Sequence, residues 1–168
     1  KLYYAIQKNP TGGIADSLKL AREFANGEKI LVILGDNIFN YNLKNTADRF
    51  KQKQKGAVVF GIDMDTGSRQ YGVVEVDNSG KVLSIEEKPD VPKSRIAQTG
   101  IYMYDDRVFE FIDKLKPSNR GQLEVTDLNN IYLKEGTLDC QTLNWWIDAG
   151  TSHDELLKAN NLVAEKVK

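Results

Sequence analysis

Hydrophobic positions along the chain form short continuous runs, separated by segments in which apolar residues recur at helical spacing. Residues 2–6 and 30–34 are almost wholly apolar, and residues 14–25 between them have the spacing of an amphipathic helix. A continuous aliphatic run is typical of a parallel strand covered on both faces. We therefore expect a strand–helix–strand crossover unit, with residues 30–34 in the centre of a parallel sheet.

The pattern changes from parallel to antiparallel signals after residue 62. Residues 43–54 predict a polar helix and residues 57–62 predict another buried strand. Residues 71–76 and 82–86 flank a turn sequence, which predicts a β-hairpin. A further strand and three helices are expected over residues 101–104, 108–115, 125–135 and 152–166. The predicted fold class is α/β, with a mixed, mainly parallel sheet covered by helices in a single domain spanning 1–168.

Composition narrows the possible partners and the cellular location. The 168 residues are 40% hydrophobic and 28% charged, with a net charge of −1, which is ordinary for a soluble globular protein. This balance argues against a basic nucleic-acid surface, and no apolar run approaches the ~18 residues of a membrane span. Cys140 is the single cysteine, which excludes an internal disulfide and fits a reducing, cytoplasmic compartment.

Two acidic residues stand at positions where a sheet commonly binds ligands. Asp36 follows the aliphatic run, and ligands of open α/β sheets lie beyond the carboxyl ends of strands. Asp148 follows Trp146, whose ring could form the wall of a sugar or base pocket. Carboxylates at such positions could bind Mg²⁺ together with substrate phosphates. The alternatives are a turn cap for Asp36 and a core position for the tryptophan.

Two cationic residues could recognise a phosphate. Lys88 follows Glu87 at the end of a predicted strand, and Arg120 precedes a predicted helix. An arginine fork suits bidentate phosphate recognition, and a glutamate can accept hydrogen bonds from hydroxyl groups. The structural alternatives are a solvated charge cluster for the first pair and a surface loop for the arginine.

Seven segments in order resemble the motifs of the sugar-1-phosphate nucleotidylyltransferase family. They are Gln7 with GIA at 13–15, LGDNIF at 34–39, YGVVE at 71–75, EEKP at 86–89, TGIY at 99–102, RGQLEVTD at 120–127 and WIDAGT at 146–151. The resemblance covers nearly the whole chain and implies a Rossmann-like fold of the nucleotide-diphospho-sugar transferase type. Within the family, the sequence is most similar to members that join glucose-1-phosphate to dTTP, giving dTDP-glucose and pyrophosphate.

The resemblance also implies roles for individual residues. Asp36 and Asp148 would hold a catalytic Mg²⁺ and, with Lys88, form the catalytic set. The residues implied in substrate binding are Gln7, Gly13, Leu34, Gly35, Gly72, Glu87, Lys88, Thr99, Arg120 and Trp146. Gln7 and Gly13 would face the pyrimidine, and Lys88 and Arg120 would bind the sugar phosphate. The hexose would be contacted by Gly72, Glu87, Thr99 and Trp146.

The sequence departs from the family pattern at two places. The glycine-rich phosphate loop that opens the family fold has no counterpart, so we expect an N-terminally incomplete domain with an exposed sheet edge and weak or no activity by itself. Gln98 stands where close relatives often carry an apolar residue, and we expect contact there through the backbone.

The resemblance to the family also implies that the protein forms homo-oligomers and that its product supplies the dTDP-rhamnose pathway.

Two other readings of the chain remain open. The first is a binding module or partner subunit that recognises a sugar phosphate or nucleotide sugar without catalysis. The second is a structural fragment that dimerises through its exposed sheet edge.

Overall fold

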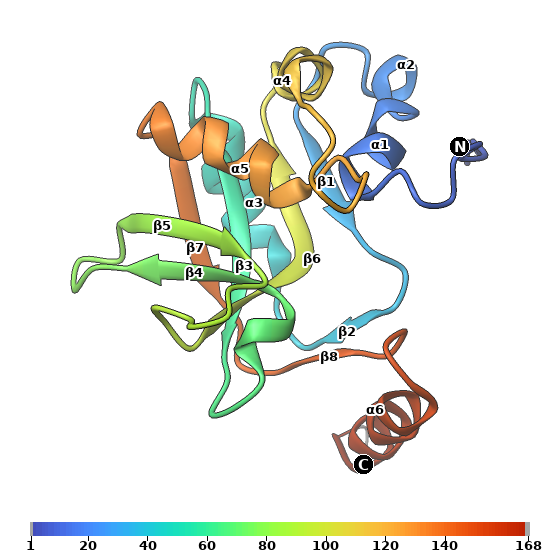
Figure 1. Cartoon of the computed structure of the whole chain (residues 1–168), viewed down its shortest axis with the longest axis vertical. Helices are drawn as coiled ribbons and strands as arrows, with labels where there is room; N and C mark the ends of the chain where they lie inside the picture. The colour runs from blue at the N-terminus through green and yellow to red at the C-terminus, as the bar shows by residue number, and fades with distance from the viewer. Residues whose placement is uncertain (1, 167–168) are drawn as a thin grey trace.

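The computed structural model describes residues 2–166 and is built around a six-stranded sheet (Figure 1). Its strands are β1 (Ile30–Ile33), β3 (Ala57–Asp63), β4 (Gly72–Val76), β5 (Val82–Glu87), β6 (Ile96–Tyr104) and β7 (Leu138–Thr142). The order is β5-β4-β6-β3-β7, and β1 also pairs with β6. A second, two-stranded sheet joins β2 (Asn37–Phe39) to β8 (Trp146–Asp148).

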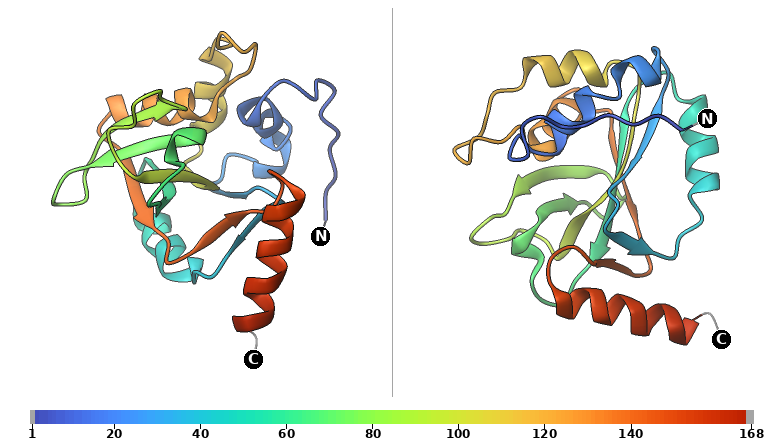
Figure 2. Two further views of the ribbon diagram at one scale, coloured as in Figure 1. Left: turned by 60° about the horizontal axis from the view of Figure 1, so that its bottom comes forward. Right: turned by 90° about the vertical axis from the view of Figure 1, so that its right-hand side faces the viewer.

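Helices cover both faces of the six-stranded sheet, as the two views in Figure 2 show. One face carries α1 (Ile14–Lys19), α2 (Arg22–Ala25), α4 (Val108–Lys114) and α5 (Val125–Lys134), and the other carries α3 (Leu43–Gln52). A large apolar cluster lies under the first group, and a smaller one around Phe50, Phe60 and Met103 lies on the opposite face. The single-turn helix η1 (Ser68–Gln70) precedes β4, and α6 (His153–Lys166) extends away from the sheet beside β8. The predicted mixed α/β class is therefore confirmed.

Strand β6 lies at the centre of the sheet and is buried over almost its whole length. It pairs antiparallel with β3 along one edge, and with β4 and β1 at opposite ends of the other edge. β3 pairs in parallel with β7. Strands β1, β3, β4 and β7 thus run in one direction, as expected of a mainly parallel sheet. Most neighbouring pairs are nevertheless antiparallel, because β6 and β5 run the other way and pair with β1, β3 and β4.

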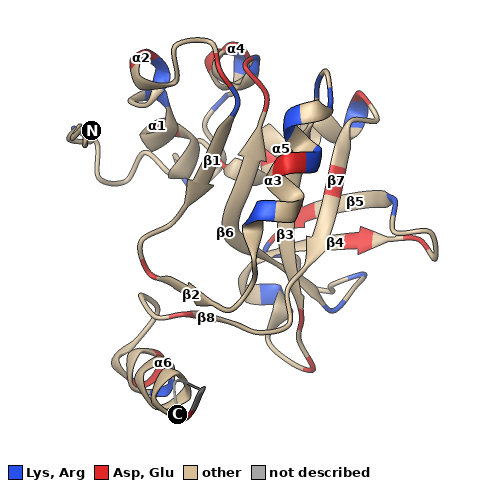
Figure 3. Ribbon diagram, turned by 180° about the vertical axis from the view of Figure 1, so that it is seen from behind, with Lys and Arg blue, Asp and Glu red and all other residues tan. Residues whose placement is uncertain are grey.

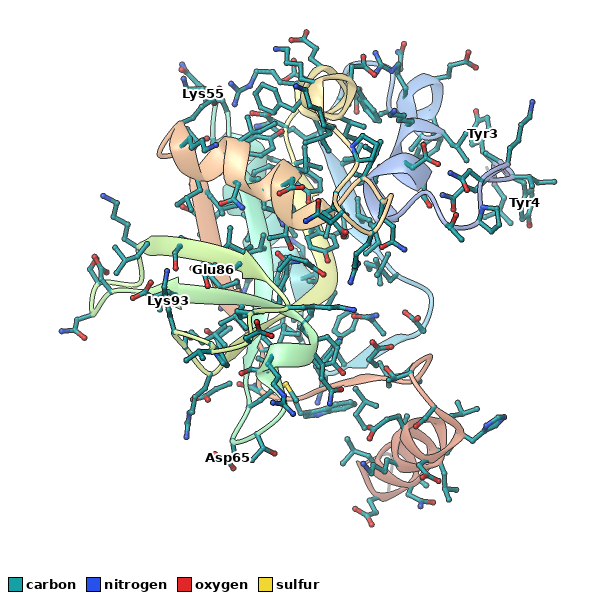
Figure 4. All side chains as sticks on the ribbon, in the orientation of Figure 1. Tyr3, Tyr4, Lys55, Asp65, Glu86 and Lys93 are labelled. Atoms are coloured by element: carbon teal, nitrogen blue, oxygen red, sulfur yellow. The ribbon has the colours of Figure 1, made fainter. Side chains whose placement is uncertain are left out.

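The N-terminal part of the chain differs from the prediction. Residues 2–6 form no strand, and all five are exposed; Figure 4 shows two of them, Tyr3 and Tyr4, at the edge of the molecule. β1 is not a central parallel strand, because it pairs with β6 alone and leaves Leu31 and Ile33 46% and 45% exposed. The predicted crossover unit is therefore wrong. An aliphatic run indicates apolar surroundings, but it does not specify the neighbouring strand.

Other local predictions are confirmed with shifts at their ends. The hairpin joins β4 to β5, and Asp77 accepts hydrogen bonds from the backbone of Ser79 at 2.8 Å and of Lys81 at 3.0 Å. Gly80 provides the left-handed residue of this turn, with φ 85°. The single helix expected over residues 14–25 is divided into α1 and α2.

Charged residues of both signs are interspersed over the elements, as Figure 3 shows. Within residues 2–166, no helix has the length and apolar character needed to cross a membrane.

A fully buried carboxylate links four segments at the end of β6. Asp105 accepts hydrogen bonds from Gly56 N at 2.6 Å, from the Tyr132 hydroxyl at 2.9 Å and from the Arg107 guanidinium at 2.7 Å. Arg107 also pairs with Glu135 at 2.8 Å. These contacts satisfy the buried charge and join the end of β6 to the start of β3, the start of α4 and the last turn of α5.

Replacing this carboxylate should destabilise the fold. We expect Asp105→Asn to lower the free energy of unfolding by about 3 kcal/mol, because the amide removes the buried one of the two carboxylates that pair with Arg107. The neighbouring Asp106 is exposed, so Asp106→Asn should change it by less than about 0.5 kcal/mol. Urea unfolding followed by circular dichroism measures both values, and equal midpoints for the two variants would contradict this role.

Candidate active site

A cavity of about 600 Å³ brings together segments that are far apart in the sequence. Of the residues predicted from the sequence, its lining includes Gln7, Gly13, Leu34, Asp36, Gly72, Glu87, Lys88, Thr99, Arg120, Trp146 and Asp148. Gly35 lies outside the lining, one residue before Asp36. The cavity also contains polar residues to whose side chains the sequence assigned no role, among them Asn37, Gln98 and Glu124.

The two-stranded sheet places the predicted metal ligands side by side. Asn37 is directly opposite Asp148 in the β2–β8 pair, and Ala149 N donates to the carbonyl oxygen of Asp36 at 2.8 Å. Asp36, directly before β2, and Asp148, at the end of β8, therefore lie in neighbouring segments. Gly150 makes room for this arrangement, because a Cβ atom built at that position would overlap the Asp36 carboxylate.

Asn37 is a buried amide that connects the carboxylate side of the cavity to its aromatic wall. Its Nδ2 donates to Asp36 Oδ1 at 2.8 Å, and its Oδ1 accepts from Gly100 N at 2.7 Å and from Trp146 Nε1 at 2.5 Å. The Trp146 ring in turn meets the Tyr71 ring edge-on, with centroids 5.2 Å apart. Asn37 thus sets the positions of a carboxylate and an indole, a role that depends on contacts between distant segments.

Lys88 occupies an unusual backbone conformation at the mouth of the cavity. Its φ is +43°, a left-handed value that costs a residue with a Cβ roughly 1–2 kcal/mol. The hydrogen bond from Lys88 N to the carbonyl of Tyr71, at 3.1 Å, holds the residue beside the start of β4. Strain of this kind persists where surrounding structure enforces it, and it is concentrated at functional sites.

Arg120 is already surrounded by acceptors. Its guanidinium donates to Glu124 from two nitrogens, each at 3.1 Å, and to Gln122 at 2.7 Å, and it lies 3.7 Å from Glu87. The side chain of Glu124 is largely buried, whereas that of Arg120 is partly exposed. A phosphate that binds Arg120 must therefore share it with Glu124 or displace that carboxylate.

The predicted pyrimidine contacts lie at the start of α1. Gln7 accepts from the Ser17 hydroxyl at 2.7 Å and donates to Asp16 at 3.1 Å, so α1 orients its amide. Gly13 has φ +88°, and a Cβ there would lie 2.6 Å from the carbonyl oxygen of Leu123. The backbone conformation and the close approach of Leu123 thus already require glycine at this position. The predicted contact of Gly13 with a base stays a prediction.

The predicted hexose region lies where β4, β5 and α5 meet. Glu87 accepts a hydrogen bond from the Thr126 hydroxyl at 2.5 Å, and burial together with the charge of Glu87 raises the pKa of Tyr102. The Thr99 hydroxyl donates to the carbonyl of Phe60 at 2.8 Å, which leaves the backbone of Thr99 for any contact with a ligand. Burial and the nearby Asp148 raise the pKa of the Tyr71 phenol.

The carboxylates present fit a magnesium ion. Within the described part of the chain, no group of three or more His, Cys, Asp and Glu side chains could enclose a metal. This excludes a closed structural zinc site there, which needs four protein ligands. Mg²⁺ is commonly held by one or two carboxylates, with water and substrate phosphates completing its shell. Asp36 and Asp148 supply that incomplete set.

The curled mixed sheet and a cavity lined by paired carboxylates, glycines and two cations define the nucleotidyltransferase class of α/β proteins. The family model described as Nucleotidyl transferase matches residues 1–166, and the chain belongs to this family.

Relatives with established names refine this assignment. The chain is 42% identical over 166 residues to glucose-1-phosphate thymidylyltransferase of Xanthomonas campestris, covering 96% of this chain and 55% of the relative. It is 44% identical over 155 residues to the protein of the same name from Neisseria gonorrhoeae, covering 90% and 53%. The chain thus spans about half the length of the curated relatives it matches.

Solved structures agree with this fold. A glucose-1-phosphate thymidylyltransferase from Bacillus anthracis, in complex with sucrose, superposes with a TM-score of 0.84 at 44% identity, over 92% of this chain and 62% of the other. A UDP-glucose pyrophosphorylase in complex with UDP-glucose gives a TM-score of 0.83 at 21% identity, over 98% and 66%. The second likeness concerns the fold alone.

The backbone strain at Lys88 can be measured by comparing glycine and alanine. We expect the free energy of unfolding of Lys88→Gly to be about 1 kcal/mol higher than that of Lys88→Ala, because glycine adopts a left-handed φ without strain. Lys81 has no such conformation, so there the alanine variant should be the more stable of the two. Urea unfolding of the four variants gives both differences, and the same order at both positions would show that Lys88 is unstrained.

Proposed function

We propose that the protein is a glucose-1-phosphate thymidylyltransferase, which joins glucose-1-phosphate to dTTP and yields dTDP-glucose and pyrophosphate. The observation that carries this proposal is the meeting of distant segments at one cavity, whose lining contains the carboxylates of Asp36 and Asp148 and the cations of Lys88 and Arg120. The names of the relatives support the choice of sugar and nucleotide. The proposal includes a cytoplasmic protein that self-associates and supplies dTDP-glucose for deoxysugar synthesis, including the dTDP-rhamnose pathway.

The proposed reaction needs positioning and charge neutralisation more than a protein nucleophile. A phosphate oxygen of glucose-1-phosphate attacks the α-phosphorus of dTTP, a new phosphorus–oxygen bond forms, and the bond to the leaving pyrophosphate breaks. Lys88 and Arg120 would bind the attacking phosphate and hold it in line. Asp36 and Asp148 would hold Mg²⁺, which when bound neutralises developing phosphate charge.

Other cavity residues would orient the two substrates. Gln7 would read the pyrimidine edge, with Gly13 next to the base. Leu34 would lie along the nucleotide, with Gly35 next to it outside the lining, and Trp146 would border the sugar. Glu87, with the backbone of Gly72 and Thr99, would bind the hexose hydroxyls.

A second candidate function is binding without catalysis. Lys88 and Arg120 are the two cationic side chains among the described residues of the cavity lining, and a nucleoside triphosphate carries more charge than they neutralise. We therefore propose that the 168-residue chain by itself turns over weakly or not at all. Release of pyrophosphate, measured beside ligand binding, separates an enzyme from a sugar-phosphate or nucleotide-sugar binding module.

Binding of the proposed product is the first test. Isothermal calorimetry of the chain with dTDP-glucose should show saturable binding, and Lys88→Ala should weaken it by about tenfold or more, since a charge-assisted hydrogen bond is lost. Lys93→Ala is a matched control, because Lys93 pairs with Glu86 outside the cavity lining (Figure 4). A folded chain that binds neither dTDP-glucose nor glucose-1-phosphate would rule the proposal out for this chain.

The metal ligands can be tested without turnover. Mn²⁺ as a spectroscopic substitute for Mg²⁺ should bind in the presence of dTDP-glucose, and Asp36→Asn or Asp148→Asn should weaken that binding at least about tenfold. Asp65→Asn serves as the control, since Asp65 is an exposed loop residue paired with Arg95 (Figure 4). Electron paramagnetic resonance measures free Mn²⁺ directly. Equal affinity in all three variants would place the metal elsewhere.

A further inference from the structure

Gln98 is a polar side chain in an otherwise apolar part of β6. The residue is only 6% exposed, yet it belongs to the lining of the cavity. An amide buried without partners is costly, so its hydrogen bonds define what it can do. The sequence suggested contact through the backbone at this position, whereas the structure places the side chain itself beneath the predicted hexose region.

A chain of buried hydrogen bonds fixes which end of the Gln98 amide is free. The Tyr104 hydroxyl donates to Asn129 Oδ1 at 2.8 Å, and Asn129 Nδ2 donates to Gln98 Oε1 at 2.8 Å. All three side chains are buried, and burial raises the pKa of Tyr104 so that its phenol keeps its proton. The carbonyl end of Gln98 is therefore occupied, and the amide nitrogen is left as the group available for new contacts.

The Gln98 amide nitrogen has little use within the protein. Among residues 2–166, its acceptor is the Tyr102 hydroxyl at 3.5 Å, a long contact that uses one of two hydrogens. The nitrogen lies close to Gly72, because a Cβ built on that glycine would be 3.1 Å away from it. The same Cβ would be 3.0 Å from the Thr126 hydroxyl, which donates to Glu87. The amide donor of Gln98 and the carboxylate acceptor of Glu87 thus lie on either side of Gly72, which has no side chain of its own.

We propose that Gln98 is a further substrate-contacting and specificity-determining residue, whose Nε2 donates a hydrogen bond to a hydroxyl oxygen of the hexose in the sugar-phosphate site. This inference rests on the proposed function. A hydroxyl both donates and accepts, so Glu87 can accept from the sugar while Gln98 donates to it. A sugar phosphate without that hydroxyl leaves the buried donor unpaired, and the site should reject it.

The test compares glucose-1-phosphate with its 2-, 3-, 4- and 6-deoxy analogues by isothermal calorimetry on the whole chain, with Mg²⁺ present throughout. The unmodified protein should bind one of these analogues about three- to tenfold more weakly because of Gln98. Gln98→Met keeps the length of the side chain and removes the donor. This variant should bind glucose-1-phosphate more weakly by the same factor. It should no longer discriminate against that analogue, while its discrimination against the other analogues stays unchanged.

Controls separate this role from a structural one. Gln141→Met makes the same exchange on β7, outside the cavity lining, and should leave every affinity unchanged. Circular dichroism verifies folding, and Gln98→Leu replaces Gln98→Met if that variant does not fold.

The outcomes also separate this inference from the proposed function. If the unmodified protein binds no glucose-1-phosphate, the proposed function fails for the chain and the inference fails with it. If it binds, and the Gln98 variant discriminates among the analogues as before, the role of Gln98 alone is overturned.

Discussion

The constraint on which the structure depends is the burial of β6, whose backbone groups need partners along both edges. β3 supplies them along one edge, but the other edge is divided between β4, which pairs at Ala97, and β1, which pairs from Ile101 onward. In the gap, Gly100 N donates to the Asn37 side chain at 2.7 Å, and Gly100 O accepts from Leu34 N at 2.9 Å. The cavity lies at this interruption, so the pairing that completes β6 also positions Asp36 and Trp146.

The sequence predicts elements whose signals are local and fails where the partner strand matters. The hairpin is confirmed because turn residues and alternating flanks specify it within one short segment. Residues 2–6 and 30–34 have equally apolar patterns, yet one is exposed coil and the other pairs on one edge only. β2 and β8 have three residues each and exist only through pairing with each other, which no local pattern reveals.

The sequence indicates many of the residues that line the cavity, because these residue types suggest a chemistry by themselves. It indicates less of the strand pairing that brings them together. The sequence assigned no role to the side chains of Asn37, Gln98 and Glu124, which all line the cavity. Glu124 contacts its near neighbours Ser118 and Arg120, but Asn37 and Gln98 act through contacts with segments far along the chain. Asn37 reaches Trp146, and Gln98 reaches Asn129. One signal was available: Gln98 interrupts an apolar strand with an amide, and a buried amide needs partners. Which partners it has, and which end of it stays free, depends on the packing of α5 against β6.

The charges of the cavity bear on how its ligands enter. Its lining contains the carboxylates of Asp36, Glu87, Glu124 and Asp148, against the cations of Lys88 and Arg120. Two negative charges therefore remain, and an anionic phosphate alone meets net repulsion. A divalent cation bound between Asp36 and Asp148 would cancel that excess, and a phosphate could then compete with Glu124 for Arg120. On this argument the proposed metal and the phosphate would bind cooperatively, because the metal would offset the charge of the acidic residues.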